Sequence, residues 1–470
     1  MPLVLGGQSA TAAAFSVDNS CRFNRADSAL LSITPAGDGN KRTFTLSIWV
    51  KRSDIGSIGT ASVNMMMDAV GSGGLSFYET DAIKFYIDNV YGQATTVLYK
   101  DPSAWMHIVQ AVDTTDAVAG DRIKTYVNGV RVTDFSSENN PPINTDSKFN
   151  NSSVVMTISQ ASASFGGYIA EAIMIDGLQL EPTSFGQFND DSPTIWEPID
   201  PSGLTFGTNG FYLDFKDSAD LGNDVSGNDN DMTSTNLAAG DQAVDSPTNN
   251  FNTWNRLWGY RNPYSTYAVT LDEGNCNWAR NDDTACCGTM AVSKGKWYVE
   301  YKVTVYNNYT SYYFGVFNVV KESGGAAPWS QWTNTDSGAG ISNSNNYLHS
   351  PPLKNVAKRV DGTNTVDYST NKCDVGDILG FCLNLDDNEI EVFNTNVSIA
   401  AAFSITGGRL YVISHVLGGS AGDIECNFGG CPGFTDSATA TDENGYGKFV
   451  YAPPSGFLAM CTKNLGTSGG

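Results

Sequence analysis

Apolar and polar residues alternate along many short segments of the chain, and this period of two predicts β-strands with one buried face. Residues 44–52 follow this pattern: Phe44, Leu46, Ile48 and Val50 alternate with Thr45, Ser47 and Trp49. Residues 168–180 are instead dense in Ile, Ala, Met and Leu, which predicts a strand buried on nearly both faces. Few segments have the spacing of an amphipathic helix, so we expect little helix.

Two tight hairpins are predicted. Asn128-Gly129 lies between the strand-like residues 122–127 and 130–135, and both residue types accept a positive φ. In the second half, residues 374–396 are expected to form a hairpin that turns between Asp386 and Glu389. A further strand is predicted to place five side chains on one face: Trp297, Val299, Tyr301, Val303 and Val305.

Prolines and glycines break the pattern in the middle of the chain, at Pro182, Gly186, Pro193, Pro198, Pro201 and Gly203. We therefore expect no further regular structure before Phe211. A length of 470 residues also favours two domains over one. The prediction is an all-β chain of two antiparallel β-sandwiches, residues 1–185 and 253–470, joined by a Pro/Gly/Asn/Asp-rich connector over residues 186–252.

Charge narrows the choice of partners. The 50 acidic residues outnumber the 27 basic ones, for a formal net charge of −23. Such a surface repels phosphate backbones and anionic lipids, so we expect no nucleic-acid partner, and no apolar run is long enough for membrane insertion. Divalent cations and neutral glycans remain compatible, and solubility alone explains the charge equally well. The first residues also lack the basic leader of a secretion signal.

The nine cysteines are unevenly spread, with one before residue 270 and eight after it, and no C-x-x-C occurs. A zinc ribbon or a thioredoxin-type site is therefore not supported. Reduced, buried thiols are expected, and the best candidate for a disulfide is Cys426 with Cys431.

Three motifs of the first half resemble the laminin G-like, concanavalin A-like lectin jelly roll: Trp105–Val109, Tyr126–Gly129 and Gly167–Asp176. That resemblance implies sugar binding, often with calcium, and in some members glucan hydrolysis. The hydrolases carry E-x-D-x-x-E on one strand. This chain has no such pattern, and Glu171 and Asp176 are five residues apart and should point to opposite faces. We expect no catalytic residues here.

Several motifs of the second half resemble the SPRY domain, a bent β-sandwich that recognises partners through loops: Gly295–Tyr301, Phe314–Val316, Gly376–Asp386, Ile390–Asn394 and Asn427–Gly429. The connector, with D-x-S-G-N-x-N-D, and the terminus around residues 447–465 resemble segments of virion proteins of tailed phages, especially marine ones. The resemblance implies a lectin-like sandwich followed by a SPRY-like one.

Calcium ligands are candidates in the connector at Asp224, Asp229 and Asp231, although the EF-hand spacing is missing and Asx turns explain the composition equally well. Loop acids of the first half are expected to be solvated rather than ligating: Asp68, Glu79, Asp81 and Asp88.

Enzyme motifs are weak throughout. Gly418–Gly422 matches G-x-S-x-G, but a strand rather than a helix is expected to follow it. Glu389 and Glu391 could share a strand face, yet a solvated pair beside a turn is favoured. His107 and His415 lie in predicted strands, where we expect packed, hydrogen-bonded imidazoles.

Aromatic residues among Asn and Ser in two segments of the second half are the better candidates for ligand binding: Tyr309, Tyr312, Trp329, Trp332, Tyr347 and His349. Flat rings beside amides suit sugars, but a protein interface or core packing is equally compatible.

The combined expectation is a non-enzymatic virion protein of a tailed phage, a tail fibre, appendage or capsid decoration assembled in the host cytoplasm. Its partners would be other virion proteins, further copies of itself and host-surface glycan. The alternatives are a surface or secreted carbohydrate-binding protein of a bacterium and a polysaccharide-degrading enzyme.

Overall fold

The computed structural model describes most of the chain, and everything below concerns these residues: 4–5, 15–56, 63–71, 73–258, 260–261, 270–280, 284–306, 311–319, 338–343, 356–360, 363–367, 375–418, 422–431 and 437–468. They form two compact units. The first unit is Thr11–Asn249, and the second is Asn250–Gly470 together with Met1–Ala10. Each is described by itself.

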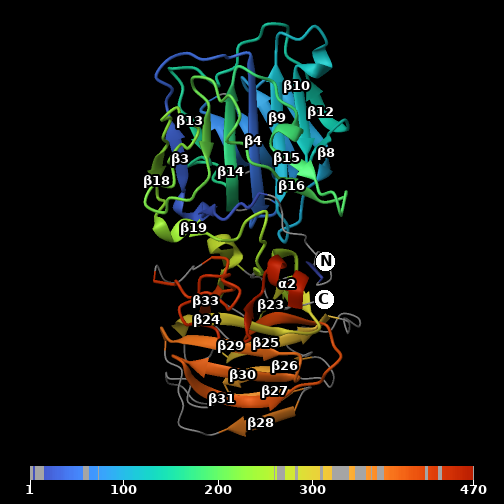
Figure 1. The fold of residues 1–470 in the computed structure, drawn as a ribbon, viewed down its shortest axis with the longest axis vertical. Helices are drawn as coiled ribbons and strands as arrows, with labels where there is room; N and C mark the ends of the chain where they lie inside the picture. The colour runs from blue at the N-terminus through green and yellow to red at the C-terminus, as the bar shows by residue number, and fades with distance from the viewer. Residues whose placement is uncertain are drawn as a thin grey trace. The chain divides into compact units, whose positions relative to one another are not determined.

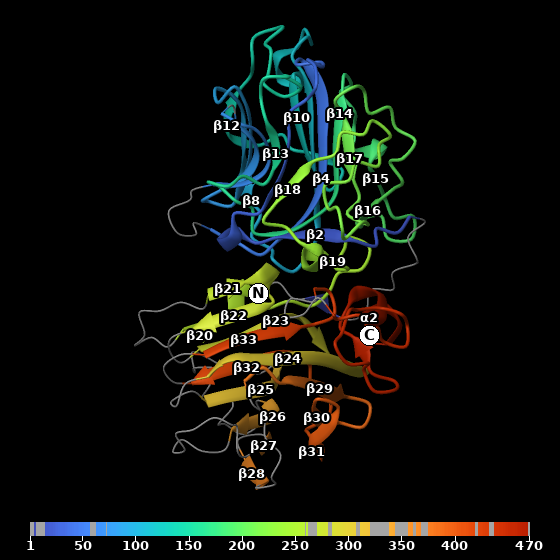
Figure 2. The same cartoon turned by 90° about the vertical axis from the view of Figure 1, so that its left-hand side faces the viewer.

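Two antiparallel sheets make up the first unit and form separate layers (Figures 1 and 2). We name them the back sheet and the front sheet. The back sheet has the order β11-β10-β9-β4-β14-β2-β19, with β17 beside β14: β2 (Ser20–Phe23), β4 (Thr43–Arg52), β9 (Met106–Asp113), β10 (Ile123–Val127), β11 (Val130–Arg131), β14 (Gly167–Asp176), β17 (Phe211–Leu213) and β19 (Gln242–Ala243).

The front sheet has the order β12-β8-β7-β6-β5-β13-β3-β18. Its strands come from both ends of the unit: β3 (Leu30–Ile33), β5 (Val63–Ala69), β6 (Gly74–Tyr78), β7 (Ala82–Ile87), β8 (Tyr91–Leu98), β12 (Phe135–Asn139), β13 (Met156–Ile158) and β18 (Thr233–Thr235). Strands distant in sequence pair in this sheet, as β3 does with β13 and β18.

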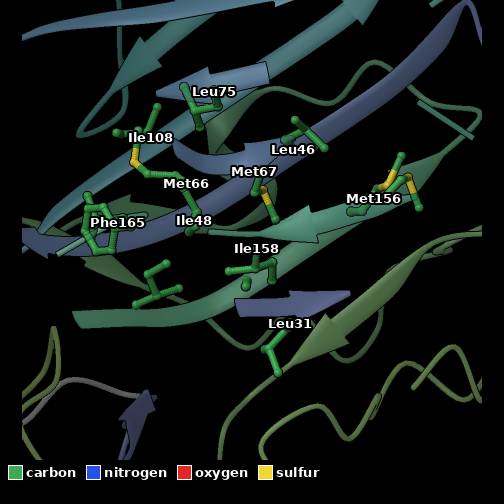
Figure 3. Close-up of a cluster of buried hydrophobic side chains, with 14 of the residues drawn as sticks. Leu31, Leu46, Ile48, Met66, Met67, Leu75, Ile108, Met156, Ile158 and Phe165 are labelled. Atoms are coloured by element: carbon green, nitrogen blue, oxygen red, sulfur yellow. The ribbon is translucent and has the colours of Figure 1, made fainter. Parts of the chain in front are cut away.

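The main core of the first unit lies between the two sheets. Leu46 and Ile48 of β4 meet Met66 and Met67 of β5 there, and Ile108 of β9 belongs to the same buried cluster (Figure 3). The alternation expected for residues 44–50 is confirmed on this side, since Phe44, Leu46, Ile48 and Val50 are all buried in this cluster.

The opposite face of β4 is also buried, so the expectation of a single core face is wrong. Ser47 and Trp49 are 1% and 3% exposed. The reason is that the segment after β14 folds back over the outer face of the back sheet, where four of its aromatic residues pack on β4, β9, β10 and β14: Phe185, Trp196, Phe206 and Tyr212.

This covering segment contains more regular structure than its prolines suggest. Pro182–Ser184 forms the 3₁₀ turn η3, and β15 (Gly186–Phe188) pairs with β16 (Trp196–Pro198) in a two-stranded hairpin. Further along, β17 pairs with β14, β18 with β3 and β19 with β2. Residues 186–249 thus add strands to both sheets of the first unit.

The predicted turn at Asn128-Gly129 is confirmed. Asn128 and Gly129 have φ values of 47° and 78° and join β10 to β11. A side chain at residue 129 would not fit, because an added Cβ would lie 2.4 Å from the ring of Trp196. Glycine is therefore required here for two separate reasons.

The second unit is likewise built of two sheets. One has the order β1-β23-β32-β25-β26-β27-β28 with β20 beside β23: β1 (Val4–Leu5), β20 (Tyr260–Arg261), β23 (Thr284–Val292), β25 (Ser311–Asn318), β26 (Gly338–Asn343), β27 (Val356–Val360), β28 (Thr363–Asp367) and β32 (Tyr411–Gly418). The other has the order β21-β22-β33-β24-β29-β30-β31 with β34 beside β24: β21 (Thr270–Asp272), β22 (Asn277–Arg280), β24 (Lys296–Tyr306), β29 (Ile378–Asn384), β30 (Glu389–Asn394), β31 (Val397–Ser404), β33 (Gly422–Asn427) and β34 (Leu458–Ala459).

Large aromatic residues fill the core of the second unit, and Trp254, Trp278, Trp297 and Tyr301 are all completely buried. The predicted face of β24 is confirmed for Trp297, Val299 and Tyr301, and the predicted hairpin turn is confirmed because it joins β29 to β30.

The part of the chain that the structure describes contains a single α-helix, α2 (Thr462–Ser468), so the all-β prediction is confirmed. The remaining helical pieces are 3₁₀ turns: η1 (Arg25–Asp27), η2 (Ala119–Asp121), η4 (Ala239–Asp241), η5 (Arg256–Trp258) and η6 (Glu273–Asn275).

Eight of the nine cysteines lie in described residues, and all eight are buried. Cys426 is a buried thiol, so the bridge to Cys431 is not formed. Among the described residues, no helix is long and apolar enough to cross a membrane.

Candidate glycan-binding face of the first unit

Most of the aromatic residues predicted to bind a ligand lie outside the described residues: Tyr309, Trp329, Trp332, Tyr347 and His349. Tyr312 belongs to β25, where its backbone pairs with Leu417 of β32. Their role in binding stays a prediction.

The connector aspartates occupy one turn-rich loop. The carboxylate of Asp224 accepts hydrogen bonds from the backbone N–H groups of Tyr212, Ser226 and Asn230 and from the Ser226 hydroxyl. Asp231 in turn accepts from the Asp224 N–H at 2.8 Å, whereas Asp229 is exposed. These contacts form Asx-type turns, which the sequence also allowed as an alternative to a calcium site. Calcium at Asp224, Asp229 and Asp231 stays a prediction.

The expectation of solvated loop acids in the first half is wrong for Asp68 and Asp81, which are each 1% exposed, and Asp68 lies within β5. Asp81 pairs with the buried Arg52 at 2.9 Å, and Asp88 lies 3.9 Å from Lys148. Asp68 accepts from the Gln160 side chain, while Glu79 is exposed. Across the described ranges, no three His, Cys, Asp or Glu side chains are grouped so as to hold a metal ion.

The enzyme-like motifs have ordinary structural positions. Glu389 and Glu391 share the outer face of β30, since Ile390 and Val392 between and beyond them are buried. Gly418 ends β32 and Gly422 begins β33, so a strand follows the G-x-S-x-G motif, as expected. A nucleophile elbow needs a helix there.

Two of the three histidines lie in the described strands, and both are packed. His107 is 1% exposed, accepts the indole N–H of Trp196 on Nδ1 at 3.0 Å and contacts Ser47 Oγ through Nε2 at 2.8 Å. Burial lowers the pKa of His107 to about 3. His415 packs against Trp278 and Phe314, with ring centroids 4.7 Å away in both cases. The prediction of packed imidazoles is confirmed for both residues, and that of hydrogen bonding is confirmed for His107.

Glu171 and Asp176 of β14 are held apart by different partners. A β-bulge lies between Ala170 and Ile173, and Glu171 within it has a φ of 49°. Its carboxyl accepts the Tyr212 hydroxyl at 2.6 Å, and burial raises its pKa to about 8. Asp176 instead accepts the backbone N–H of Asn40 and of Asn209. Both acids thus hold neighbouring loops.

The outer face of the front sheet carries a different group of side chains. Ile83, Phe85 and Ile87 of β7 point into the core, so Lys84 and Tyr86 between them point outward, and both are half-buried. On β6, Phe77 points inward and Tyr78 outward. The Lys84 ammonium nitrogen lies 4.1 Å from the centroid of the Tyr78 ring and 4.8 Å from that of Tyr86. We call these three residues the tyrosine–lysine platform.

Small residues surround this platform. Across the strands, Lys84 pairs with Ser76 of β6 and with Ala94 of β8, and Tyr86 pairs with Gly92. Neither neighbouring strand therefore raises a large side chain beside the platform. The small residues Ser76 and Ala94 are buried, at 4% and 8% exposed, so Tyr78, Lys84 and Tyr86 form the accessible part of β6 and β7.

Polar side chains continue the same outer face toward the other edge of the sheet. Asp68, Thr157, Ser32 and Thr233 are successive cross-strand partners on β5, β13, β3 and β18. Asp68 is 1% exposed beneath Gln160, and burial raises its pKa to about 6. Aromatic residues at one end and hydroxyls at the other give the face both kinds of group that sugars contact.

Sequence reasoning did not single out this platform. The signal was present, because Tyr78, Lys84 and Tyr86 occupy the polar phase of alternating segments. These residues can be assigned to an open face only once the tertiary structure is known. The connector aromatics cover the outer face of the back sheet and not that of the front sheet.

A family model of the concanavalin A-like lectin/glucanases superfamily, Laminin_G_3, matches residues 26–176. These residues supply most of both sheets of the first unit, so this part of the chain is similar to that superfamily. A search among curated protein sequences found no match.

Three solved structures illustrate the structural similarities. The SPRY domain of human HERC1 is 9% identical, with a TM-score of 0.27, and the match covers 37% of this chain and 96% of that one. The PSpry domain of TRIM65 is 9% identical, with a TM-score of 0.26, and covers 34% and 83%. A putative carbohydrate binding protein from Bacteroides ovatus is 13% identical, with a TM-score of 0.31, and covers 47% and 59%.

Proposed function

We propose that the first unit binds a glycan on the outer face of its front sheet and that the chain performs no chemistry on it. The observation that carries this proposal is the tyrosine–lysine platform. Tyr78 and Tyr86 project from a sheet face with small neighbours, whereas the opposite sheet of the same sandwich is covered by the chain's own aromatic residues.

The chemistry of this face suits a saccharide. Tyrosine combines an apolar ring, which packs against the C–H face of a sugar, with a hydroxyl that exchanges hydrogen bonds with sugar hydroxyls. Ser32 and Thr233, which are half-buried and exposed respectively, add hydroxyls toward the other edge of the sheet. A face of this width would contact several sugar units rather than one.

We further propose that the protein is a component of a tailed-phage virion, as a tail fibre, appendage or capsid decoration, assembled in the host cytoplasm. The support is the resemblance of the connector and of residues 447–465 to phage virion proteins. In this role the first unit would bind host-surface glycan. The second unit would bind other virion proteins or further copies of the chain.

The glycan proposal is tested with the full-length chain against a panel of bacterial surface polysaccharides, by a direct binding assay. We expect Tyr78→Ala and Tyr86→Ala each to weaken binding about tenfold, because each removes one ring contact. Tyr446→Ala is the matched control, since Tyr446 also lies beside a lysine, at 5.5 Å from Lys463, but in the second unit. Binding by the wild type that both platform variants retain in full would refute the proposed face.

The virion proposal is tested separately, by mass spectrometry and electron microscopy of purified phage particles. We expect the chain to be present in multiple copies on the particle. Its absence from particles, together with export by a bacterium, would favour a bacterial carbohydrate-binding protein. Hydrolysis of a polysaccharide by the purified chain would contradict the non-enzymatic role.

A further inference from the structure

All but one of the lysines of the first unit lie beside a carboxylate. The unit contains seven lysines, and all seven are described. Six have a carboxylate oxygen within 4 Å: Lys41, Lys51, Lys100, Lys124, Lys148 and Lys216. Lys84 has no described carboxylate within that distance.

This exception stands out because acidic residues are abundant, with 50 in the chain against 27 basic ones. On a protein with so many acidic residues, a lysine usually lies near a carboxylate because carboxylates are abundant on the surface. Instead, the ammonium of Lys84 is held by two tyrosine rings, at 4.1 Å and 4.8 Å from their centroids. A cation held by rings is oriented without having its charge neutralised.

The cross-strand neighbours of Lys84 bring no competing charge. Ser76 and Ala94 are its partners on the two adjacent strands, and neither carries a charge. An incoming anionic group would form a charge-assisted hydrogen bond with the ammonium while the rest of the ligand lies against Tyr78 or Tyr86.

We propose that the front face selects an acidic glycan, and that Lys84 binds the anionic substituent of one sugar unit, a carboxylate or a sulfate. This inference rests on the proposed glycan-binding function and adds its ligand class. The tyrosines would contact the sugar rings, and Lys84 would supply the preference for charge. Elsewhere the strongly acidic surface would repel the same polymer, so binding would be confined to this face.

The experiment compares acidic polysaccharides with their own neutral derivatives, using the full-length chain. Probes are uronate-containing bacterial polysaccharides before and after carboxyl reduction, and a sulfated polysaccharide before and after desulfation. We expect neutralisation to weaken binding by the wild type about tenfold or more. The two pairs of probes separate a carboxylate from a sulfate as the preferred group.

Variants then assign the preference to Lys84. We expect Lys84→Met to weaken binding of the acidic polymer about tenfold more than binding of its neutral derivative, while Lys84→Arg keeps the preference. Lys216→Met is the matched control, because Lys216 is 56% exposed and lies beside Asp214. Circular dichroism would verify that each variant is folded.

Each other outcome has a distinct meaning. Equal binding of acidic and neutral polymers by the wild type would overturn the charge preference and leave glycan binding intact. Equal losses in Lys84→Met and Lys216→Met would show a general effect of charge and would likewise overturn it. Binding of no polysaccharide at all would overturn the proposed function, and the acidic-glycan inference with it.

Discussion

Trp196 donates its indole N–H to Nδ1 of His107 at 3.0 Å, and the two rings are stacked with their centroids 6.1 Å apart. Trp49 stacks on the same imidazole at 4.7 Å. Because Nδ1 accepts, the proton of the neutral ring must lie on Nε2, beside Ser47 Oγ. The contact attaches β16 of the covering segment to β9 of the back sheet.

Trp196→Phe should destabilise the first unit by about 1 to 2 kcal/mol, because it keeps an aromatic ring but removes the donor to a buried nitrogen. Trp196→Ala should cost about 3 to 5 kcal/mol, since it also removes the ring. Denaturant unfolding of the full chain measures both. Leu178→Ala, at a side chain that is 43% exposed, should change stability by under about 0.5 kcal/mol. Equal effects of the Phe and Ala variants would contradict a role for the ring.

Glu171 should contribute a fall in the stability of the first unit as pH rises from about 4.5 to 8. Burial raises its folded-state pKa from 4.5 to about 8, so across this window the folded state holds a proton that the unfolded state has released. The stabilisation is complete below pH 4.5 and lost by pH 8. Glu171→Gln, which still accepts from the Tyr212 hydroxyl, should flatten this part of the pH profile measured by thermal unfolding.

His107 should act in the opposite direction between about pH 3 and 6.5, so the two groups offset each other from about pH 4.5 to 6.5. Its folded-state pKa of about 3 lies below the ordinary 6.5, so its stabilisation is present above pH 6.5 and is lost as pH falls toward 3.

Glu79→Gln, at an exposed carboxyl, is the control for Glu171→Gln. A profile that Glu171→Gln leaves unchanged would show that this proton is not linked to folding.

Alternation and turn chemistry are local, which is why the sequence predicts the strands and hairpins of both units well. Phe44 to Val50 and the Asn128-Gly129 turn lie as expected. The burial of Ser47 and Trp49 could not be predicted locally, because residues more than 130 positions away cover them. Pro182 to Gly203 indicates a loop, and only the packing of Phe185 and Trp196 shows that this loop is a third layer.

The candidate site was harder to predict for the same reason. Tyr78, Lys84 and Tyr86 look like the solvent-facing half of ordinary strands until the open and the covered sheets are distinguished. The Asn/Ser-rich aromatic segments of residues 306–313 and 327–350 attract attention because their composition alone is unusual. Charge pairing is equally invisible in sequence, since Lys148 and Asp88 meet across sixty residues while Lys84 meets no described acid.

Glu300 of β24 should be required for the C-terminal segment of the second unit. It is completely buried and accepts four hydrogen bonds, from Tyr298 Oη, Asn427 Nδ2 and the backbone N–H groups of Val450 and Tyr451. Glu300→Ala leaves these donors without that acceptor, and we expect a loss of about 3 kcal/mol or more. Hydrogen exchange should show faster exchange at residues 447–465. Glu389→Ala, at a half-buried carboxyl on the outer face of β30, should leave this exchange nearly unchanged; equal effects would refute the role of Glu300.

The buried pair of Lys51 and Asp245 should behave as an ionic unit in the first unit. Their atoms lie 2.6 Å apart, both side chains are 1% exposed, and Trp105 donates to the second oxygen of Asp245 at 2.8 Å. Asp245→Ala removes this carboxylate from beside a buried ammonium and should cost about 3 to 5 kcal/mol. The double variant Lys51→Met with Asp245→Ala should recover much of that loss, because no buried charge is left without its partner. Urea unfolding of the two single variants and the double variant gives the coupling energy. Losses that simply add in the double variant would show that the pair contributes through packing rather than through charge.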